Sequence, residues 1–194
     1  VYVGFTSLAS KFGDVELAVS TIIMKLFMLF SYFVDGFAYA GEALVGKYIG
    51  LNQESGVRSQ DKSDVSRVVG LLFAWSLGVG VLFTLIFALW SGGFYHAMTS
   101  DTTVLARLAD YTAWLIAMPI VSTLAFMWDG VYAGATAGKQ IRNAMIYAAL
   151  GFVICYVATY WWLGIQGLYI AYFAHLAARV LYLTFSWKRV QQMV

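Results

Sequence analysis

The stretch V-S-R-V-V-G-L-L-F-A-W-S-L-G-V-G-V-L-F-T-L-I-F-A-L-W, residues 65–90, decides the fold class. It is apolar throughout its middle, and it is long enough for a helix to cross a bilayer core, which needs about 20 such residues. The whole chain has the same character, since 61% of its 194 residues are hydrophobic and only 11% are charged. Soluble domains carry about 25% charged residues. The excess apolar surface must therefore face lipid, which predicts a membrane protein.

Similar apolar runs recur along the chain and predict an all-α, polytopic bundle of transmembrane helices. These runs do not alternate apolar and polar residues as the strands of a membrane barrel do. The chain also starts with Val1 inside an apolar stretch, so we interpret it as part of a longer protein. We expect the end of one span at 1–12 and five full spans at 15–50, 65–90, 104–136, 143–163 and 168–187.

The basic residues of the loops predict the orientation of these spans, because cytoplasmic loops are enriched in Lys and Arg. The opposite loops hold only Lys11 and Arg107. We therefore expect a cytoplasmic C-terminus in a multi-pass protein of the plasma (inner) membrane. Eight basic residues fall in alternate loops and in the C-terminal tail: Lys47, Arg58, Lys62, Arg67, Lys139, Arg142, Lys188 and Arg189.

Composition also narrows the partners and the chemistry. The net charge of +2 is small and its basic residues form no stripe, which argues against nucleic-acid binding. The single cysteine, Cys155, has no metal-ligand spacing around it, and no nucleophile with its base is recognisable. We therefore predict no enzyme activity and no cofactor, and we expect membrane lipid to surround the chain.

Ionisable residues inside the predicted spans are the most informative feature, because each costs at least about 2.5–3.5 kcal/mol to insert at mid-membrane. Asp35 and Glu42 are seven residues apart, so they share one helix face with Tyr39 between them. Such a polar stripe is expected to face a cavity. Lys25, on the same span, is interpreted as a residue that reaches the interface or pairs with an acid.

Four further ionisable residues of later spans bear on the function, and one of them, Asp110, lies close to the outer end of its span and is interpreted as a residue in contact with water. Arg179 is deep enough to need a carboxylate partner, and Asp35 or Asp129 could supply it. Asp129 is interpreted either as a functional site or as a structural hydrogen-bond partner, and His175 as a packing residue. We predict that Asp35, Tyr39, Glu42, Asp129 and Arg179 form a polar cavity.

Small residues and one proline predict how the helices pack. Gly46 and Gly50 form one G-x-x-x-G pattern, and Gly130, Gly134 and Gly138 form a double one, which is typical of close helix contacts in membranes. The only proline, Pro119, removes a backbone hydrogen bond in mid-span, and we expect a kink or break there.

Two longer motifs point to a family. The run D-G-F-A-Y-A-G-E-A-L-V-G-K-Y-I-G at 35–50 resembles the eighth transmembrane helix of the multidrug and toxic compound extrusion (MATE) family, in its DinF-like branch. The run W-D-G-V-Y-A-G-A-T-A-G-K-Q-I-R-N-A-M at 128–145 resembles the tenth helix and the loop after it. A-A-R-V-L-Y-L at 177–183 is similar to the last helix.

The resemblance implies two six-helix lobes around a central cavity, with residues 1–194 forming the C-terminal transmembrane lobe and a missing N-terminal lobe as its partner. It also implies an antiporter that exports cationic or amphiphilic compounds in exchange for H⁺ or Na⁺. Asp129 matches an aspartate that belongs to a Na⁺ site in some members. The tyrosine that those members place one turn earlier is Ala125 here.

Two other functions remain open at this level. A flippase or exporter of lipid-linked oligosaccharide has a related fold, but its cavity is usually rich in arginine, and here Arg179 is the only arginine deep inside a predicted span. A non-transporting membrane scaffold or an intramembrane enzyme would instead pair its carboxylates or place a nucleophile beside a base. The expected function is therefore export by alternating access.

Overall fold

The computed structural model describes residues 2–55 and 62–193, and in this part of the chain every regular element is a helix. Five of these helices are long and apolar enough to cross a membrane. The predicted all-α polytopic bundle is therefore confirmed. The elements are α1 (Tyr2–Ala9), η1 (Ser10–Phe12), α2 (Asp14–Ser55), α3 (Lys62–Met98), α4 (Thr102–Leu108), η2 (Ala109–Tyr111), α5 (Thr112–Gly134), α6 (Gly138–Leu163) and α7 (Ile165–Met193).

Several helices extend beyond the apolar stretches from which they were predicted. α3 continues from the expected end near residue 90 to Met98, and α6 begins at Gly138 instead of 143. Apolar length measures the part of a helix that lies in lipid, whereas the helix itself ends only where its backbone turns. One such turn is at Gly164, where a φ of 52° separates α6 from α7, a conformation that glycine adopts easily.

The predicted span at 104–136 is built from three pieces, because α4, η2 and α5 follow one another without a gap. Asp101 caps α4 by accepting hydrogen bonds from the backbone N–H groups of Thr103 (2.8 Å) and Val104 (3.3 Å). The departure from α-helical geometry lies at 109–111, not at the proline. α5 is continuous through Pro119, so of the kink or break expected there the break is wrong, and the kink stays a prediction. Pro119 is the eighth residue of α5, beyond its first turn, so it removes one hydrogen bond within the helix without ending it.

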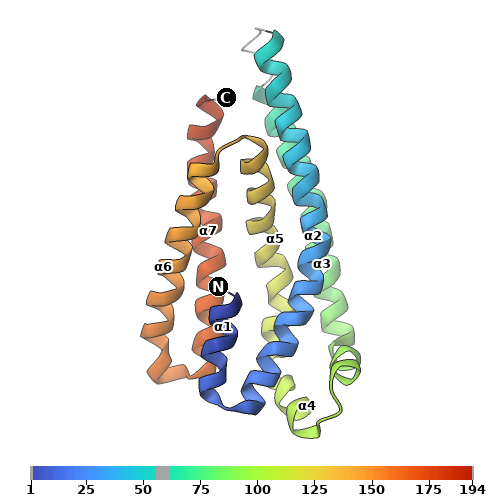
Figure 1. Cartoon of the computed structure of the whole chain (residues 1–194). Helices are drawn as coiled ribbons and strands as arrows, with labels where there is room; N and C mark the ends of the chain where they lie inside the picture. Colours follow the sequence, from blue (N-terminus) through green and yellow to red (C-terminus); the bar gives the residue numbers. More distant parts are fainter. Residues whose placement is uncertain (1, 56–61, 194) are drawn as a thin grey trace.

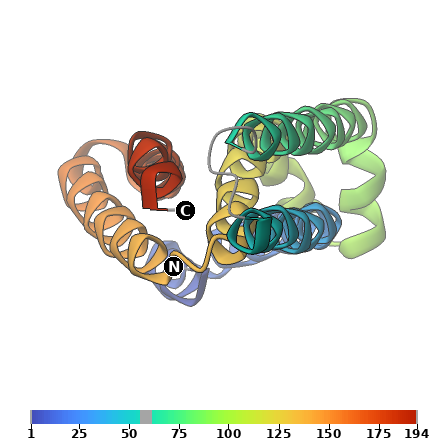
Figure 2. The ribbon, with the colours of Figure 1, turned by 90° about the horizontal axis from the view of Figure 1, so that it is seen from above.

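The helices form two groups that meet at α5, as the view along the bundle shows (Figure 2). On one side α6 packs along α7, and on the other α2 and α3 pack against α5 and against each other. α5 also contacts α7, and α1 contacts both α2 and α7. The connection between the two groups therefore depends chiefly on α5 and on the short α1.

The loops alternate between two ends of the bundle (Figure 1). The C-terminal end of α2, the α5–α6 connection and the C-terminus lie at one end, whereas α4 and the turns α1–α2 and α6–α7 lie at the other. The loops with most of the basic residues thus share one end of the molecule. Of those residues, Arg58 lies outside the described part of the chain.

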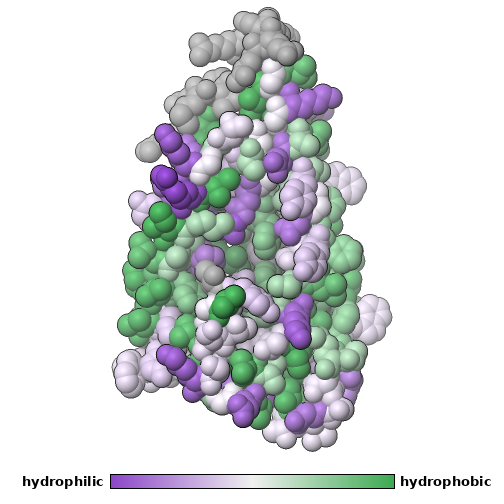
Figure 3. Space-filling model, viewed as in Figure 1, coloured by the Kyte–Doolittle hydropathy of each residue, from purple (hydrophilic) through white to green (hydrophobic). Residues whose placement is uncertain are grey.

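Apolar side chains fill the bundle and also cover its outside. One core cluster joins α1, α2, α3, α5 and α7 around Phe5, Phe30 and Tyr169, and a second lies around Trp128 and Tyr132. On the face that Figure 3 shows, apolar residues also cover much of the two sides at mid-height, while hydrophilic ones lie toward the two ends and along the middle of the face. Large exposed apolar side chains include Trp75, Leu89, Ile154, Trp161, Trp162 and Phe185. This distribution is the one expected of a lipid-facing surface.

Candidate functional site

A pocket of about 210 Å³ lies between α2 and α5 and collects most of the predicted polar residues. α2 contributes Asp35, Tyr39 and Glu42, which follow the one-face spacing of a helix, and α5 contributes Asp129. The predicted stripe on α2 therefore faces the acid of α5 across one hollow. The remaining lining residues are small or aromatic: Ala38, Phe126, Gly130 and Ala133.

Glycines of α5 bring the two helices close enough to form this pocket. A Cβ atom added at Gly130 would lie 2.7 Å from the carbonyl carbon of Ala38, and one added at Gly134 would lie 3.0 Å from the Cα of Glu42. Gly46 of α2 faces Gly134 from the other side, with its added Cβ 3.4 Å from the Gly134 oxygen. The small-residue pattern thus places the backbones of α2 and α5 in direct contact.

Two glycines of the same patterns take no part in this contact. A Cβ atom added at Gly50 or at Gly138 would meet nothing within 4 Å. The predicted close packing is therefore confirmed for Gly46, Gly130 and Gly134 and wrong for the ends of the two patterns. Gly50 lies near the C-terminal end of α2, and Gly138 is the first residue of α6, beyond the end of α5, so neither lies in the stretch where α2 and α5 touch.

Arg179 of α7 binds both carboxylate oxygens of Asp129 through two of its guanidinium nitrogens. Its Nε donates to Asp129 Oδ1 at 3.0 Å, and its second terminal nitrogen forms an ion pair with Oδ2. The arginine side chain is 9% exposed and that of Asp129 is 26% exposed, and of the two only Asp129 lines the pocket, so Arg179 lies behind it. Two-point pairing of a planar guanidinium with a carboxylate is among the stronger charge-assisted contacts.

This ion pair decides between the two predicted partners of Arg179, because Asp129 forms it and Asp35 does not. Asp35 is near enough to interact electrostatically with the same guanidinium. Arg179 also lies over the ring of Phe126, 6.0 Å from its centroid. The arginine is therefore held by α5 on two sides, and it ties α7 to the helix that lines the pocket.

The three polar residues of α2 keep their functional groups available. Tyr39 is 70% exposed, Glu42 is exposed and Asp35 is partly buried. Among residues 2–55 and 62–193, no side chain forms a hydrogen bond or ion pair with Asp35, Tyr39 or Glu42 within bonding distance. Once Asp129 is neutralised by Arg179, the pocket retains two carboxylates without a direct partner. Its chemistry is complementary to a cation.

The other singled-out residues lie away from this pocket. Lys25 is exposed on α2, and Asp110 is exposed near the end of α4. His175 is buried in α7, has a ring contact with Tyr172 and does not line the pocket, and its Nδ1 has no hydrogen-bond partner among the described residues. Within the described residues, no group of three or more His, Cys, Asp or Glu side chains is arranged to hold a metal ion.

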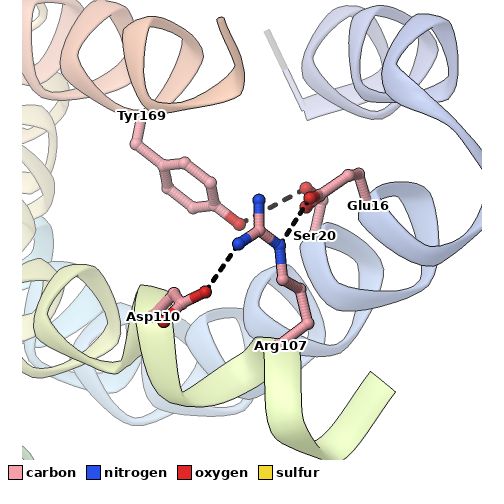
Figure 4. Close-up of polar contacts among 5 residues, drawn as sticks. All are labelled: Glu16, Ser20, Arg107, Asp110 and Tyr169. Atoms are coloured by element: carbon pink, nitrogen blue, oxygen red, sulfur yellow. Dashed lines mark hydrogen bonds and ion pairs between the residues drawn. The ribbon is translucent and has the colours of Figure 1, made fainter. Parts of the chain in front are cut away.

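A second cluster of polar residues was not predicted from the sequence. Arg107 of α4 donates from Nε to Glu16 of α2 at 2.7 Å and from Nη1 to Asp110 of η2 at 2.6 Å, and nearby Tyr169 of α7 donates to Ser20 of α2 at 3.3 Å (Figure 4). The spacing of three between Arg107 and Asp110 could have predicted their pair. Nothing local could have predicted Glu16, because 91 residues separate it from Arg107.

Comparisons with known proteins agree with these motifs. The MatE family model matches residues 2–161. DNA damage-inducible protein F of Escherichia coli is 33% identical over 185 residues, which cover 95% of this chain and 38% of that protein. Protein DETOXIFICATION 42 of Arabidopsis thaliana is 22% identical over 151 residues, or 77% of this chain and 27% of that protein. No solved structure matches the chain.

The chain thus spans well under half the length of either relative. The family model nevertheless covers most of the chain, including α2 and α5, which carry the pocket and the two longer motifs. With its helices long enough to cross a membrane, this chain belongs to the MatE family, the multidrug and toxic compound extrusion family whose DinF-like branch its motifs resemble.

Proposed function

We propose that this chain is the C-terminal lobe of an ion-coupled antiporter that exports cationic or amphiphilic compounds by alternating access. The observation that most directly supports this proposal is the pocket between α2 and α5, in which Asp35 and Glu42 have no direct partner while Asp129 is held by Arg179. Members of the family are transporters, not enzymes. A missing N-terminal lobe would supply the other wall of the transport cavity.

Carboxylates in a membrane cavity support exchange of one cation for another. A charged acid deep in a bilayer is costly unless a cation or a proton neutralises it. A cationic substrate, H⁺ or Na⁺ would each neutralise Asp35 or Glu42, so binding of the coupling ion would lower the affinity for the substrate. Such competition for the same acids is the simplest way to couple entry of an ion to release of a drug.

Arg179 gives Asp129 a different role in this proposal. The guanidinium is an internal cation that neutralises Asp129, so a Na⁺ ion at Asp129 would have to displace it first. The proposed sites for external cations are therefore Asp35 and Glu42, with Tyr39 offering its ring and hydroxyl at the mouth. The aromatic ring would attract a quaternary or protonated amine through its π face.

The same charges count against export of a lipid-linked oligosaccharide. Its diphosphate would need free cations in the cavity, whereas the one arginine at this pocket is already paired. Carboxylates without partners would repel the phosphates. A cationic substrate is therefore favoured over an anionic one.

Export assays on the full-length protein test the proposal. Asp35→Asn and Glu42→Gln are expected to lower export of a fluorescent cationic dye from cells about tenfold, since loss of a contact worth about 1.4 kcal/mol is a tenfold change. Asp14→Asn is the matched control, because Asp14 is an exposed acid at the start of the same helix α2, outside the pocket. Export at the wild-type rate in both pocket variants would refute the proposal.

The coupling ion is tested in reconstituted vesicles. Dye uptake is measured after an imposed pH gradient and, separately, after an imposed Na⁺ gradient of equal size. We expect one gradient to drive uptake in the wild type and to lose that effect in Asp35→Asn. Uptake that neither gradient accelerates would contradict ion-coupled antiport.

A further inference from the structure

A second pocket, of about 300 Å³, lies at the end of the bundle opposite the C-terminus, beside the α6–α7 turn. Lys11 of η1 forms one wall, and the last turns of α6 form the other with Tyr156, Val157, Tyr160 and Trp161. None of these residues belongs to the proposed transport site. The pocket combines one cation with three aromatic rings at the end of a membrane-spanning helix.

Two polar groups of this pocket lack a partner. Lys11 is exposed, and no carboxylate of the described residues lies within 4.0 Å of its ammonium, although Asp14 and Glu16 follow closely in sequence. The Tyr156 hydroxyl is buried and has no hydrogen-bond partner among the described residues.

The walls of the pocket are an ordered series of rings. Phe152 stacks on Tyr156 with centroids 6.3 Å apart, and Tyr156 meets Tyr160 edge to face at 5.5 Å. Tyr160 then contacts Trp161 at 5.3 Å. The series leads from the charged end of the pocket along α6 toward mid-membrane. The pocket therefore has a polar group, the Lys11 ammonium, at one end and apolar side chains of α6 leading away from it.

The position of the pocket fits the boundary between water and lipid. Trp161 is 84% exposed and Trp162 is 87% exposed at the end of α6, and tryptophan is enriched at the headgroup level of bilayers. Val157, also exposed, lies one turn before Trp161 toward the hydrocarbon core. A phospholipid of the adjacent leaflet would therefore have its headgroup beside Lys11 and its acyl chains along α6.

We propose that this pocket is a specific binding site for one anionic phospholipid. The Lys11 ammonium binds the phosphate, and Val157, Tyr160 and Trp161 contact the glycerol and the first methylenes. An anionic headgroup is favoured because the charge of Lys11 is not neutralised by the protein. A cationic substrate is disfavoured here for the same reason, despite the aromatic rings.

Free phosphate is a weaker candidate for this pocket. A single exposed lysine competes poorly with water for a small anion, whereas a lipid adds the burial of its apolar part against Val157 and Trp161. The two sources of phosphate chemistry differ in whether acyl chains contribute to binding, so they can be separated by measurement.

Native mass spectrometry of the full-length protein in detergent tests the site. Dioleoylphosphatidylglycerol is titrated against the wild type, Lys11→Gln and Tyr156→Phe, with Lys25→Gln as the control that removes an exposed lysine outside the pocket. We expect one tight lipid adduct in the wild type. Its affinity should fall about fivefold in Lys11→Gln, since one lysine near anionic lipid contributes about that factor, and should not change in Tyr156→Phe, because that hydroxyl is buried out of reach of the pocket.

Two further probes distinguish a bound phospholipid from a bound free phosphate. Dioleoylglycerol, which has the same chains without a phosphate, should bind more weakly than the phospholipid, and inorganic phosphate should not displace the adduct. Equal affinity of the wild type and Lys11→Gln for the phospholipid would overturn the proposal. So would equal binding of dioleoylglycerol, which would indicate unspecific contact, or displacement by inorganic phosphate, which would indicate an ion site.

Discussion

The ion pair between Asp129 and Arg179 is the residue-scale feature on which the pocket depends. It joins α5 to α7 and buries most of a guanidinium inside a membrane-spanning bundle. In such surroundings the loss of one partner costs more than the pair itself contributes, because the remaining charge is left without compensation. The sequence left open whether Asp129 has a structural or a functional role. In the structure it holds α7 in place, and it also lines the proposed transport pocket.

Replacement of Asp129 by asparagine should destabilise the folded protein. Asp129→Asn leaves Arg179 buried without a counter-charge, and we expect the free energy of unfolding in detergent to fall by about 3 kcal/mol. Addition of Arg179→Gln should recover part of this loss, so that the two changes are not additive. Unfolding of both variants and of the double variant measures the coupling.

Arg107→Gln is the matched comparison for that experiment. Its ion pairs with Glu16 and Asp110 involve an arginine that is about half exposed, so we expect a loss of about 1 kcal/mol or less. Equal losses in Arg107→Gln and Asp129→Asn would contradict the special status of the buried pair.

The contact between α2 and α5 is the important feature at the scale of elements. α5 contributes Gly130 and Gly134 to it, and α2 contributes Ala38, Glu42 and Gly46. The helices touch through backbone atoms, so no side chain can be added there without moving a whole helix. The pocket lies beside this contact, and its width is set by it.

A single methyl group at this contact should separate the helices. Gly130→Ala would place a Cβ atom against the backbone of Ala38, and overpacking of this kind costs about 1–3 kcal/mol. We expect lower thermal stability in detergent together with reduced dye export. Gly70→Ala in α3 is the control, because an added Cβ meets nothing within 4 Å there. Equal stability of the two variants would refute the proposed contact.

Orientation in the membrane belongs to the scale of the whole molecule. The basic loops share one end of the bundle, and cytoplasmic loops are enriched in such residues. We therefore propose that the α5–α6 connection and the C-terminus are cytoplasmic, and that the α6–α7 turn is external. The phospholipid pocket would then bind a lipid of the outer leaflet.

Cysteine labelling of intact cells checks this orientation. In a protein that carries Cys155→Ala, we expect a membrane-impermeant maleimide to label Trp162→Cys, at the α6–α7 end, but not Lys139→Cys, at the α5–α6 connection. Both positions are exposed, so access to the reagent depends on the side of the membrane. The reverse labelling pattern would show that the proposed orientation is wrong.

Transport by the chain alone is a further whole-molecule expectation. Alternating access needs two bodies that move against each other, and this chain is proposed to be one of them. The purified 194-residue chain in vesicles should therefore give no ion-driven dye flux above that of empty vesicles. Flux above that background would contradict the need for a second lobe.

Much of the fold could be predicted from the sequence, because lipid imposes a simple rule on each helix separately. Each apolar run predicted a helix, although the helix ends and the three-part construction of α4, η2 and α5 were missed. Hydropathy reports immersion in lipid, whereas helix ends depend on caps and turns such as those at Asp101 and Gly164. The continuity of α5 through Pro119 was also missed, since neighbouring packing is invisible in a local pattern.

The sequence by itself determined the helical membrane class, the family and the polar face of α2, because composition and helical spacing are local properties. Only the tertiary structure decided that Arg179 binds Asp129 and not Asp35, and that Glu16 meets Arg107 across 91 residues. The same holds for the phospholipid pocket, whose walls come from η1 and α6. Partners far apart in sequence depend on how helices cross, and that depends on the few glycines that allow two backbones to touch.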